Sequence, residues 1–291
     1  MGYPRDVGTI DTMVSLPKQD RREVYQFLGP QLRDTESKEQ FSFPAQYMFK
    51  DLPPEVEENV DTVAVVLDNM DRFGVERAMI GVRPERDDAI RALKEHPDRF
   101  FASVEVNPNA GMDTLRFMEE MAGLYDVRAF TTFPAGCATA INDKKYWPVY
   151  AKCVELDKPI FICAGVPGPR VPMEPQRVEY LDEVCWFFPE LTVVTRHGCE
   201  PWADLAVKLM LKWPNLHYST SAFAPKHYPD DIVRYANTRG ADKILYAGYF
   251  AAGLTYDRIW GDMDAVAFDD AVWPKFLREN AIRVLKLDEP A

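Results

Sequence analysis

The sequence lacks a long hydrophobic run, and none of its apolar stretches approaches the roughly 20 residues that a membrane-spanning helix needs. Its first residues, MGYPRDVGTIDTM, also lack the apolar core of a secretory signal peptide. Cysteine is scarce, with 5 residues, an odd number, and no C-x-x-C pair. These absences argue against a disulfide framework. We therefore expect a cytoplasmic protein with free, mostly buried thiols and no membrane partner.

Basic residues are in the minority, because 34 Lys and Arg stand against 46 Asp and Glu, for a formal net charge of -12. Such a balance opposes non-specific binding of nucleic acid, which needs a basic face. It leaves an anionic small molecule open as a substrate, since a local group of arginines can sit inside an acidic shell. We expect a small-molecule substrate and no nucleic-acid partner.

Short β-rich apolar runs alternate with longer amphipathic runs along the whole chain. The predicted strands are residues 7–15, 76–82, 100–106, 128–134, 159–165, 192–198, 216–222 and 242–249. Predicted helices lie between them and at 272–286. Eight such units indicate one α/β domain over residues 1–291, a (β/α)8 TIM barrel. A doubly wound sheet is the alternative, but the chain has neither G-x-G-x-x-G after its first strand nor G-x-x-x-x-G-K-[ST].

One segment breaks this rhythm. Residues 17–57 separate the first strand from its helix and contain the aromatic, proline-rich run FSFPAQYMFKDLPP. In a barrel, a segment that follows a strand lies on the catalytic face. Its apolar side chains would be costly to leave in water; they are Phe41, Phe43, Tyr47, Met48 and Phe49. We predict that this long insertion forms a lid over the barrel mouth or a contact in a homodimer or higher homo-oligomer.

Four stretches of the chain resemble the amidohydrolase-related barrels that include the aminocarboxymuconate-semialdehyde decarboxylase group. They are GTIDTM, PIFICAGVPG, LTVVTRHGCEPW and PNLHYSTSAFAPKHYPDDIVRYANTRGADKILYAG, at the first, fifth, sixth and last two predicted strands. The resemblance covers nearly the whole chain. It implies a TIM barrel of hydrolase or lyase type with active-site residues at the carboxyl ends of the strands.

The resemblance also implies a metal site whose ligands this sequence does not retain. Family members carry D-x-H-x-H at the first strand, where this chain has Asp11, Met13 and Ser15. The histidine position of the fifth strand holds Cys163, and the aspartate position of the last strand holds Tyr249. A catalytic zinc ion needs three protein ligands of nitrogen, oxygen or sulfur type. We therefore predict no bound metal and no other cofactor.

Three side chains are predicted to carry the chemistry. His197 occupies the family position of a general acid/base, a role that suits an imidazole with an ordinary pKa near ~6.5. The plain alternative is a histidine held in the core. Asp11 would orient His197 or share its proton, or else brace the barrel mouth. Tyr249 would donate a proton or hydrogen bond, or only line the pocket.

Other residues at the strand ends are predicted to bind substrate. Arginine matches a carboxylate through two parallel hydrogen bonds. The candidates are Arg83, Arg170 and Arg196, of which we expect Arg83 or Arg196 to touch the ligand. Glu105 should pair with an arginine. The pocket should also include Met13, Ser15 and Cys163, the last as a buried thiol rather than a nucleophile.

Two functions of different classes follow. The leading one is a metal-independent enzyme of hydrolase, lyase, hydratase or decarboxylase type. It would act on a small cyclic or carboxylated molecule by acid/base catalysis centred on His197. The alternative is a catalytically dead barrel that serves as a ligand-binding or partner subunit. An open, polar mouth favours the enzyme, whereas a mouth plugged by Met13, Tyr249 and the aromatics of the insertion favours the binding subunit.

Overall fold

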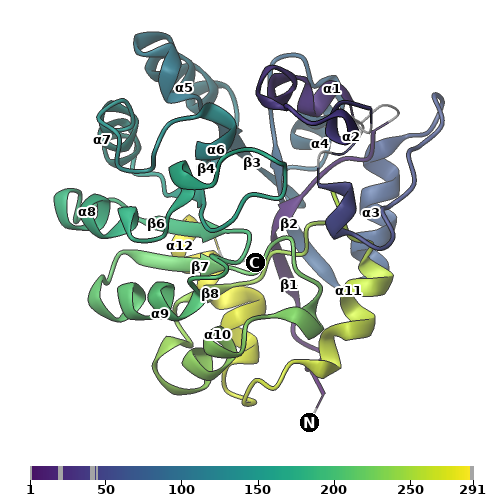
Figure 1. Cartoon of the computed structure of the whole chain (residues 1–291). Coiled ribbons are helices and arrows are strands. Elements are labelled where there is room, and N and C mark those ends of the chain that lie inside the picture. Colours follow the sequence, from purple (N-terminus) through teal and green to yellow (C-terminus); the bar gives the residue numbers. More distant parts are fainter. Residues whose placement is uncertain (1, 19–21, 40–42, 44, 289–291) are drawn as a thin grey trace.

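Eight parallel strands form the centre of the molecule, and each pairs with the next one along the chain (Figure 1). The computed structural model describes residues 2–18, 22–39, 43 and 45–288. The strands are β1 (Thr9–Val14), β2 (Val75–Gly81), β3 (Phe100–Glu105), β4 (Val127–Thr132), β5 (Ile160–Cys163), β6 (Val193–Arg196), β7 (Leu216–Ser219) and β8 (Ile244–Leu245). The N–H of Thr12 donates to the carbonyl of Tyr246 at 3.2 Å, which joins the two ends of the sheet into a nearly closed barrel.

Helices surround the strands (Figure 1). The longer ones are α3 (Thr62–Phe73), α4 (Asp87–Glu95), α5 (Met112–Leu124), α7 (Trp147–Glu155), α8 (Tyr180–Phe187), α9 (Ala203–Lys212), α10 (Asp230–Tyr235), α11 (Tyr256–Asp262) and α12 (Asn280–Leu285). Short helices include α1 (Arg22–Tyr25), η1 (Gln26–Gln31), α2 (Thr35–Glu39), η2 (Gln46–Met48), α6 (Pro134–Cys137) and η5 (Pro225–His227). Among the described residues, no helix is long and apolar enough to cross a bilayer. The predicted TIM barrel is confirmed.

Helix α11 was not predicted from the sequence. This helix begins after Thr255, whose hydroxyl accepts a hydrogen bond from the N–H of Arg258. A threonine at this position satisfies one of the free N–H groups of the first turn. The predicted eighth strand is also shorter than expected, because only Ile244–Leu245 pair as a strand before the chain turns across the barrel mouth.

A layer of apolar side chains fills the lower part of the barrel. Its members are Ile10, Met79, Phe101, Ala129, Phe161, Val194 and Leu245, and side chains of α12 pack against them. Successive residues of a strand point to opposite faces, so the residue two positions further along also faces inward. In β2, β3, β4 and β5 those residues are small: Gly81, Ser103, Thr131 and Cys163. The barrel is therefore filled near the amino ends of the strands and hollow near their carboxyl ends.

The end of β1 departs from this alternation. Asp11 pairs with Ala78 of β2 and Val14 pairs with Ile80, so three steps on β1 match two steps on β2. Such a bulge re-aims the side chains beside it. As a result Met13 faces the barrel mouth. Asp11 precedes the bulge, is fully buried and faces α11.

The described part of the segment between β1 and α3 packs over the carboxyl ends of the strands. Phe43 is buried, and Phe49 stacks on Tyr249 with ring centroids 6.0 Å apart. Tyr47 and Met48 remain about half exposed, at 53% and 56%, contrary to the expected burial. Phe41 lies outside the described residues. The position of this segment fits the lid version of the prediction, while its role as a lid or dimer contact stays a prediction.

Candidate active site

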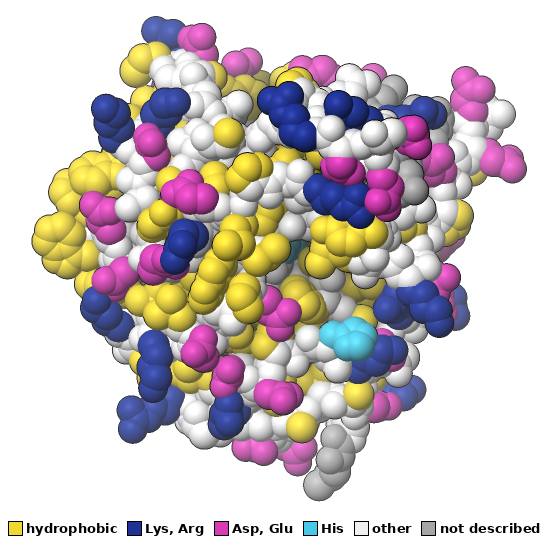
Figure 2. Space-filling view, in the orientation of Figure 1, with side chains coloured by type: hydrophobic (Ala, Val, Ile, Leu, Met, Phe, Trp, Pro, Cys, Tyr) yellow, Lys and Arg dark blue, Asp and Glu magenta, His cyan; other side chains and the backbone are white. Residues whose placement is uncertain are grey.

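A cavity of about 1250 Å³ opens at the carboxyl ends of the strands. In the space-filling view it is a hollow edged by apolar side chains, with charged side chains farther out (Figure 2). Aromatic and aliphatic residues dominate its wall: Tyr25, Phe27, Leu28, Phe43, Phe49, Phe133, Phe223, Tyr249 and Leu254. Charged side chains line it as well, among them Arg83, Glu105 and Arg196. A concave site with an apolar wall and polar groups that fix the ligand's orientation is the usual form of a small-molecule site.

Arg196 is the cation at the floor of this cavity. It follows Val194 of the apolar layer by two positions, so the alternation of β6 points it inward. Its guanidinium donates a hydrogen bond to the sulfur of Met13 at 3.2 Å. Among the described residues it has no carboxylate partner. A partly buried guanidinium with a thioether as its partner is well placed to receive an anionic oxygen.

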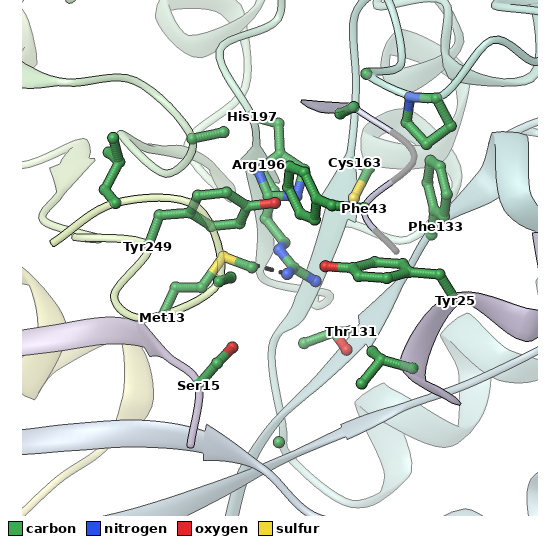
Figure 3. Close-up of a pocket in the computed structure, with 18 of the residues that line it drawn as sticks. Met13, Ser15, Tyr25, Phe43, Thr131, Phe133, Cys163, Arg196, His197 and Tyr249 are labelled. Carbon is green, nitrogen blue, oxygen red and sulfur yellow. Dashed lines mark hydrogen bonds between the residues drawn. The ribbon is translucent and has the colours of Figure 1, made fainter. Parts of the chain in front are cut away.

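His197 follows directly and lies at the same wall (Figure 3). Its Nδ1 is 3.1 Å from the hydroxyl oxygen of Ser221, which also accepts the N–H of His197 at 3.1 Å. Burial, and then the charge of Arg196, lower the pKa of His197 well below its ordinary value, and a hydrogen bond to the Ser221 main chain raises it against these effects. The imidazole is therefore neutral at pH 7.

Two tyrosines bring hydroxyl groups to the same space. The hydroxyls of Tyr249 and Tyr25 point toward the guanidinium of Arg196 from opposite sides (Figure 3). The Tyr249 ring meets the imidazole of His197 edge to face, with centroids 5.3 Å apart. Burial raises the pKa of Tyr249 to about 12, so its phenol stays protonated and can donate a hydrogen bond. Tyr25 comes from α1, so the segment after β1 supplies part of the site.

The backbone around the cavity is strained. Four non-glycine residues at the ends of β6, β7 and β8 have positive φ angles: His197 (63°), Cys199 (59°), Ala222 (71°) and Tyr249 (63°). This conformation costs energy for a residue with a side chain and tends to cluster at functional sites. The strain coincides with the residues that the sequence singled out, His197 and Tyr249.

The structure corrects the position expected for Asp11. Its carboxylate accepts hydrogen bonds from the N–H of Met13 at 2.9 Å, the N–H of Gly248 at 2.8 Å and the hydroxyl of Tyr256 at 2.9 Å. It contacts neither the cavity nor the imidazole of His197, because it follows the inward-facing Ile10 and the alternation of the strand points it outward. The group that orients His197 is Ser221, and Asp11 braces the loop after β8 instead.

Arg170 also lies elsewhere than expected. Its guanidinium pairs with Asp34 at 2.8 Å and Glu36 at 2.7 Å, and it sits over the ring of Tyr47. It is not part of the cavity wall. Two carboxylates of the segment after β1 therefore neutralise the guanidinium that was expected to bind substrate.

The remaining binding candidates all line the cavity: Met13, Ser15, Arg83, Cys163 and Arg196. Arg83 pairs with Glu105 at 3.1 Å, so the expected arginine partner of Glu105 is present. Burial raises the pKa of the Cys163 thiol to about 11, which leaves it protonated and unsuited to nucleophilic attack.

The side chains at the strand ends do not fit the metal site that the family resemblance implies. No group of three or more His, Cys, Asp or Glu within the described ranges is placed to hold a metal ion. The positive guanidinium of Arg196 lies against Met13, at the former ligand position, and would repel a second cation there. Cys163 and His197 then offer two ligands at most, one fewer than a catalytic metal ion needs.

Ser221 and Tyr25 were missed as site residues. Ser221 stood at the end of the seventh predicted strand, where its position was a usable signal. Tyr25 carries no comparable signal, because only the packing of the segment after β1 brings it to the cavity.

Comparison with known proteins agrees with the geometry. The sequence model of the family described as Amidohydrolase matches residues 37–287. No curated protein matches the chain in sequence. The described part of the chain is similar to an uncharacterised TIM-barrel protein from Bordetella bronchiseptica, with a TM-score of 0.75 and 21% identity over 96% of this chain and 99% of that one.

Two similar structures are decarboxylases. A 5-carboxyvanillate decarboxylase from Novosphingobium aromaticivorans, complexed with manganese and 4-hydroxy-3-methoxy-5-nitrobenzoic acid, has a TM-score of 0.69 and 14% identity over 97% of both chains. A 2,6-dihydroxybenzoate decarboxylase from Rhizobium has a TM-score of 0.62 and 16% identity over 97% of this chain and 99% of that one. At these identities the similarity concerns the fold.

Proposed function

Because the chain belongs to the amidohydrolase family, we propose that it is a lyase that decarboxylates a small hydroxylated aromatic acid by proton transfer at His197, without a metal ion. The observation that carries this proposal is the pair formed by Arg196 and His197, adjacent residues that face one aromatic-lined cavity. The decarboxylases with a similar fold support the reaction type.

The cavity offers a place for each part of such a substrate. The aromatic body packs between Tyr249 and Phe133, whose rings line opposite parts of the wall (Figure 3). A charged ring oxygen lies against the guanidinium of Arg196, and the protonated phenol of Tyr249 donates a second hydrogen bond to it. Donors fixed before the reaction stabilise a developing oxyanion without reorganisation.

His197 begins this reaction as a base. Its Nδ1 faces Ser221, and with the hydrogen on Nδ1 the lone pair of Nε2 faces the substrate. His197 removes the proton of the ring hydroxyl, and the phenolate oxygen is held by Arg196. The ring carbon that bears the carboxylate then takes the proton back from His197. The carbon–carboxylate bond breaks, its electron pair restores the aromatic ring, and CO2 leaves.

Hydrolysis of a lactone or ester is the second candidate, and the low pKa of His197 favours it. A neutral imidazole can take a proton from water as the water oxygen attacks a carbonyl carbon, with Arg196 holding the oxyanion. The protonated imidazole, a strong acid because of its low pKa, then protonates the leaving alkoxide. The alternative of a dead binding subunit is less well supported, since the mouth holds a large cavity rather than a plug.

Two expectations from the sequence stay proposals. We place the protein in the cytoplasm as a homodimer or higher homo-oligomer. Light scattering tests the second, and a particle of only the 33.3 kDa chain mass would contradict it.

Turnover of named acids tests the proposed function. The purified protein is incubated with 2,6-dihydroxybenzoate, 5-carboxyvanillate and a panel of related hydroxybenzoates and aromatic lactones, and released CO2 and ring-opened acids are measured. We expect CO2 release from at least one hydroxybenzoate. Ring opening without CO2 release would shift the assignment to the hydrolase, and no turnover across the panel would overturn the proposal.

The variant His197→Asn tests the residue that we hold responsible. General acid/base catalysis typically contributes roughly 10²–10⁴ in rate, so kcat should fall by about that factor. Asparagine keeps one hydrogen-bonding group near Ser221, so the melting temperature should change little. A kcat within about threefold of wild type, together with a lower melting temperature, would show that His197 is a core brace instead.

A further inference from the structure

Four arginines line the cavity, and they fall into two classes: Arg83, Arg86, Arg196 and Arg258. The first two are neutralised. Arg83 pairs with a glutamate at 3.1 Å, and Arg86 holds the carboxylate of Asp88 through two hydrogen bonds of 2.8 and 2.9 Å. Paired arginines of this kind contribute to the wall and have little remaining attraction for a ligand.

Arg196 and Arg258 belong to the other class. Neither has a carboxylate within ion-pair distance in the described part of the chain. The Nη1 atom of Arg258 is shielded from solvent and has no hydrogen-bond partner. A buried polar atom without a partner costs free energy, and it is rare in folded proteins unless a water, ion or ligand satisfies it.

The residues around Arg258 do not neutralise it. It lies on the first turns of α11, where the neighbouring Asp257 is engaged by Arg72 at 2.7 Å. Asp262, one turn further on, pairs with Lys226 of η5 at 3.2 Å. Lys226 also lines the cavity, but its charge is already paired with Asp262, so neither carboxylate of α11 is left over for Arg258.

The cavity connects the two unpaired arginines. Both arginines line it, and so do Tyr249, Ala252 and Leu254, which lie between them in the chain. These connecting side chains are apolar or aromatic. The volume of about 1250 Å³ exceeds the range of about 300–1,000 Å³ that is usual for small-molecule pockets. The site therefore has room for a body longer than one ring between two cationic ends.

We propose that the substrate is a dianion with an apolar body, whose reacting oxygen binds Arg196 and whose second, unreactive carboxylate binds Arg258. This inference rests on the proposed function in one respect only: the reacting oxygen of the substrate binds Arg196. Arg258 acts as a specificity residue: it selects acids with a second carboxylate at the far end and holds them in one orientation.

Matched pairs of ligands test the proposal without turnover. The probes are isophthalate, naphthalene-2,6-dicarboxylate and biphenyl-4,4′-dicarboxylate, each with its monomethyl ester, and titration calorimetry gives Kd. A hydrogen bond to a charged group contributes about 1.5–3 kcal/mol, so at least one diacid should bind wild type about tenfold or more tightly than its ester. No preference for any diacid over its ester would overturn the proposal.

Arginine variants test whether the preference for a diacid over its monomethyl ester comes from Arg258. Arg258→Leu should abolish it, Arg258→Lys should retain part of it, and a melting curve for each variant checks folding. Arg86→Leu is the matched control, because it removes the same charge from the same cavity but takes away an arginine that Asp88 already holds. Persistence of the preference in Arg258→Leu, or its equal loss in Arg86→Leu, would refute the role of Arg258.

Failure of the proposed function gives a different pattern. If Arg196 is not the reacting end, Arg196→Met should leave the affinities of both the diacid and the ester unchanged. If only the present inference fails, Arg196→Met still weakens both ligands, whereas Arg258→Leu weakens neither.

Discussion

Asp11 is fully buried and His197 partly buried beside the barrel mouth, and their surroundings move their pKa values in opposite directions. Burial favours the neutral form of each, which lowers the pKa of the imidazole and raises that of the carboxyl. For Asp11 the shift reaches about 7, against three hydrogen-bond donors that lower it. The imidazole is thus neutral at pH 7, and one of its ring nitrogens is free to accept a proton. The buried carboxyl has a structural role, and its ionisation makes the free energy of unfolding depend on pH.

Asp11 should make the stability of the protein fall as the pH rises. Its pKa is raised from 3.8 to about 7, so the folded chain keeps a proton that the unfolded chain releases. That contribution is complete below pH 3.8 and is lost as the pH rises through 7. Between pH 5 and pH 8 we expect a loss of about 3 kcal/mol in wild type that is absent in Asp11→Asn.

Urea unfolding of both proteins at the two pH values measures this difference. At pH 5 Asp11→Asn should be about as stable as wild type, because Met13 and Gly248 both donate to Oδ1, which the amide oxygen can replace, and the amide NH2 can donate to the Tyr256 hydroxyl oxygen. Equal pH dependence in the two proteins would show that Asp11 is ionised in the folded state throughout.

Two elements pack at the barrel mouth, the loop after β8 and the described part of the segment after β1. The loop after β8 is fixed by Asp11 through the N–H of Gly248 and by a hydrogen bond from the Tyr249 N–H to the Met13 carbonyl at 3.1 Å. The segment after β1 is fixed by Arg170 and by the Tyr47 hydroxyl, which donates to the carbonyl of Gly168 at 2.7 Å. The site residues therefore depend on contacts between elements distant in the sequence.

Gly248 should tolerate no side chain. A Cβ there would lie 2.5 Å from the Asp11 Oδ2 and 2.7 Å from the Tyr246 hydroxyl, both in the packed interior. We expect Gly248→Ala to destabilise the protein by about 1–3 kcal/mol, as overpacking usually does. Gly261→Ala is the control, because that Cβ meets nothing within 4 Å on helix α11 and should stabilise by about 0.5–1 kcal/mol. Thermal melts compare the two, and equal effects would contradict the prediction.

Removing Arg170 should loosen the segment after β1 more than it lowers overall stability. Its ion pairs are partly exposed, and such pairs contribute about 0–1 kcal/mol each. Arg170→Ala should therefore leave the melting temperature nearly unchanged, while limited proteolysis within residues 22–48 becomes faster. Arg177→Ala, which breaks a pair with Glu179 outside this segment, is the control. Unchanged proteolysis in Arg170→Ala would mean that the aromatic contacts alone hold the segment.

At the scale of the whole molecule, an acidic protein surrounds a cavity with two arginines, Arg196 and Arg258, that no carboxylate of the described residues pairs with. The charge of Arg196 repels any second cation at the strand ends. Whether the protein holds a metal ion therefore depends on this arginine as well as on the ligand side chains. The family resemblance and the manganese-bound decarboxylase of similar fold make this the sharpest difference to test.

The purified protein should contain far less than one transition-metal ion per chain. The reason is chemical: Met13, Ser15 and a protonated Cys163 occupy the ligand positions, and Arg196 adds a positive charge beside them. Elemental analysis of protein prepared without a histidine tag or added metal measures the content. About one zinc, manganese or iron ion per chain, or loss of activity on chelation, would contradict the prediction.

Much of the fold could be predicted because the alternation of strands and helices is a local property. All eight strands appear near their predicted ranges, since each is a short apolar run bounded by polar residues. Helix α11 could not be predicted in the same way, because its start depends on a threonine cap and its burial on the barrel behind it. The overall position of the site followed from the fold, because barrel sites lie at the carboxyl ends of strands.

The sequence by itself determined the barrel, the placement of His197 and Arg196 at the end of β6, and the loss of the usual ligand side chains. Only the tertiary structure decided which of the strand-end residues face the cavity. Asp11 follows the inward-facing Ile10 and points outward by simple alternation, whereas Met13 faces the cavity only because of the bulge between Asp11 and Val14, which local periodicity does not reveal. Likewise, two carboxylates some 130 residues earlier in the chain hold Arg170, whereas no carboxylate in the described part of the chain pairs with Arg258. The partner of a charged residue cannot be predicted from the sequence, because ion pairs form between elements that only folding brings together.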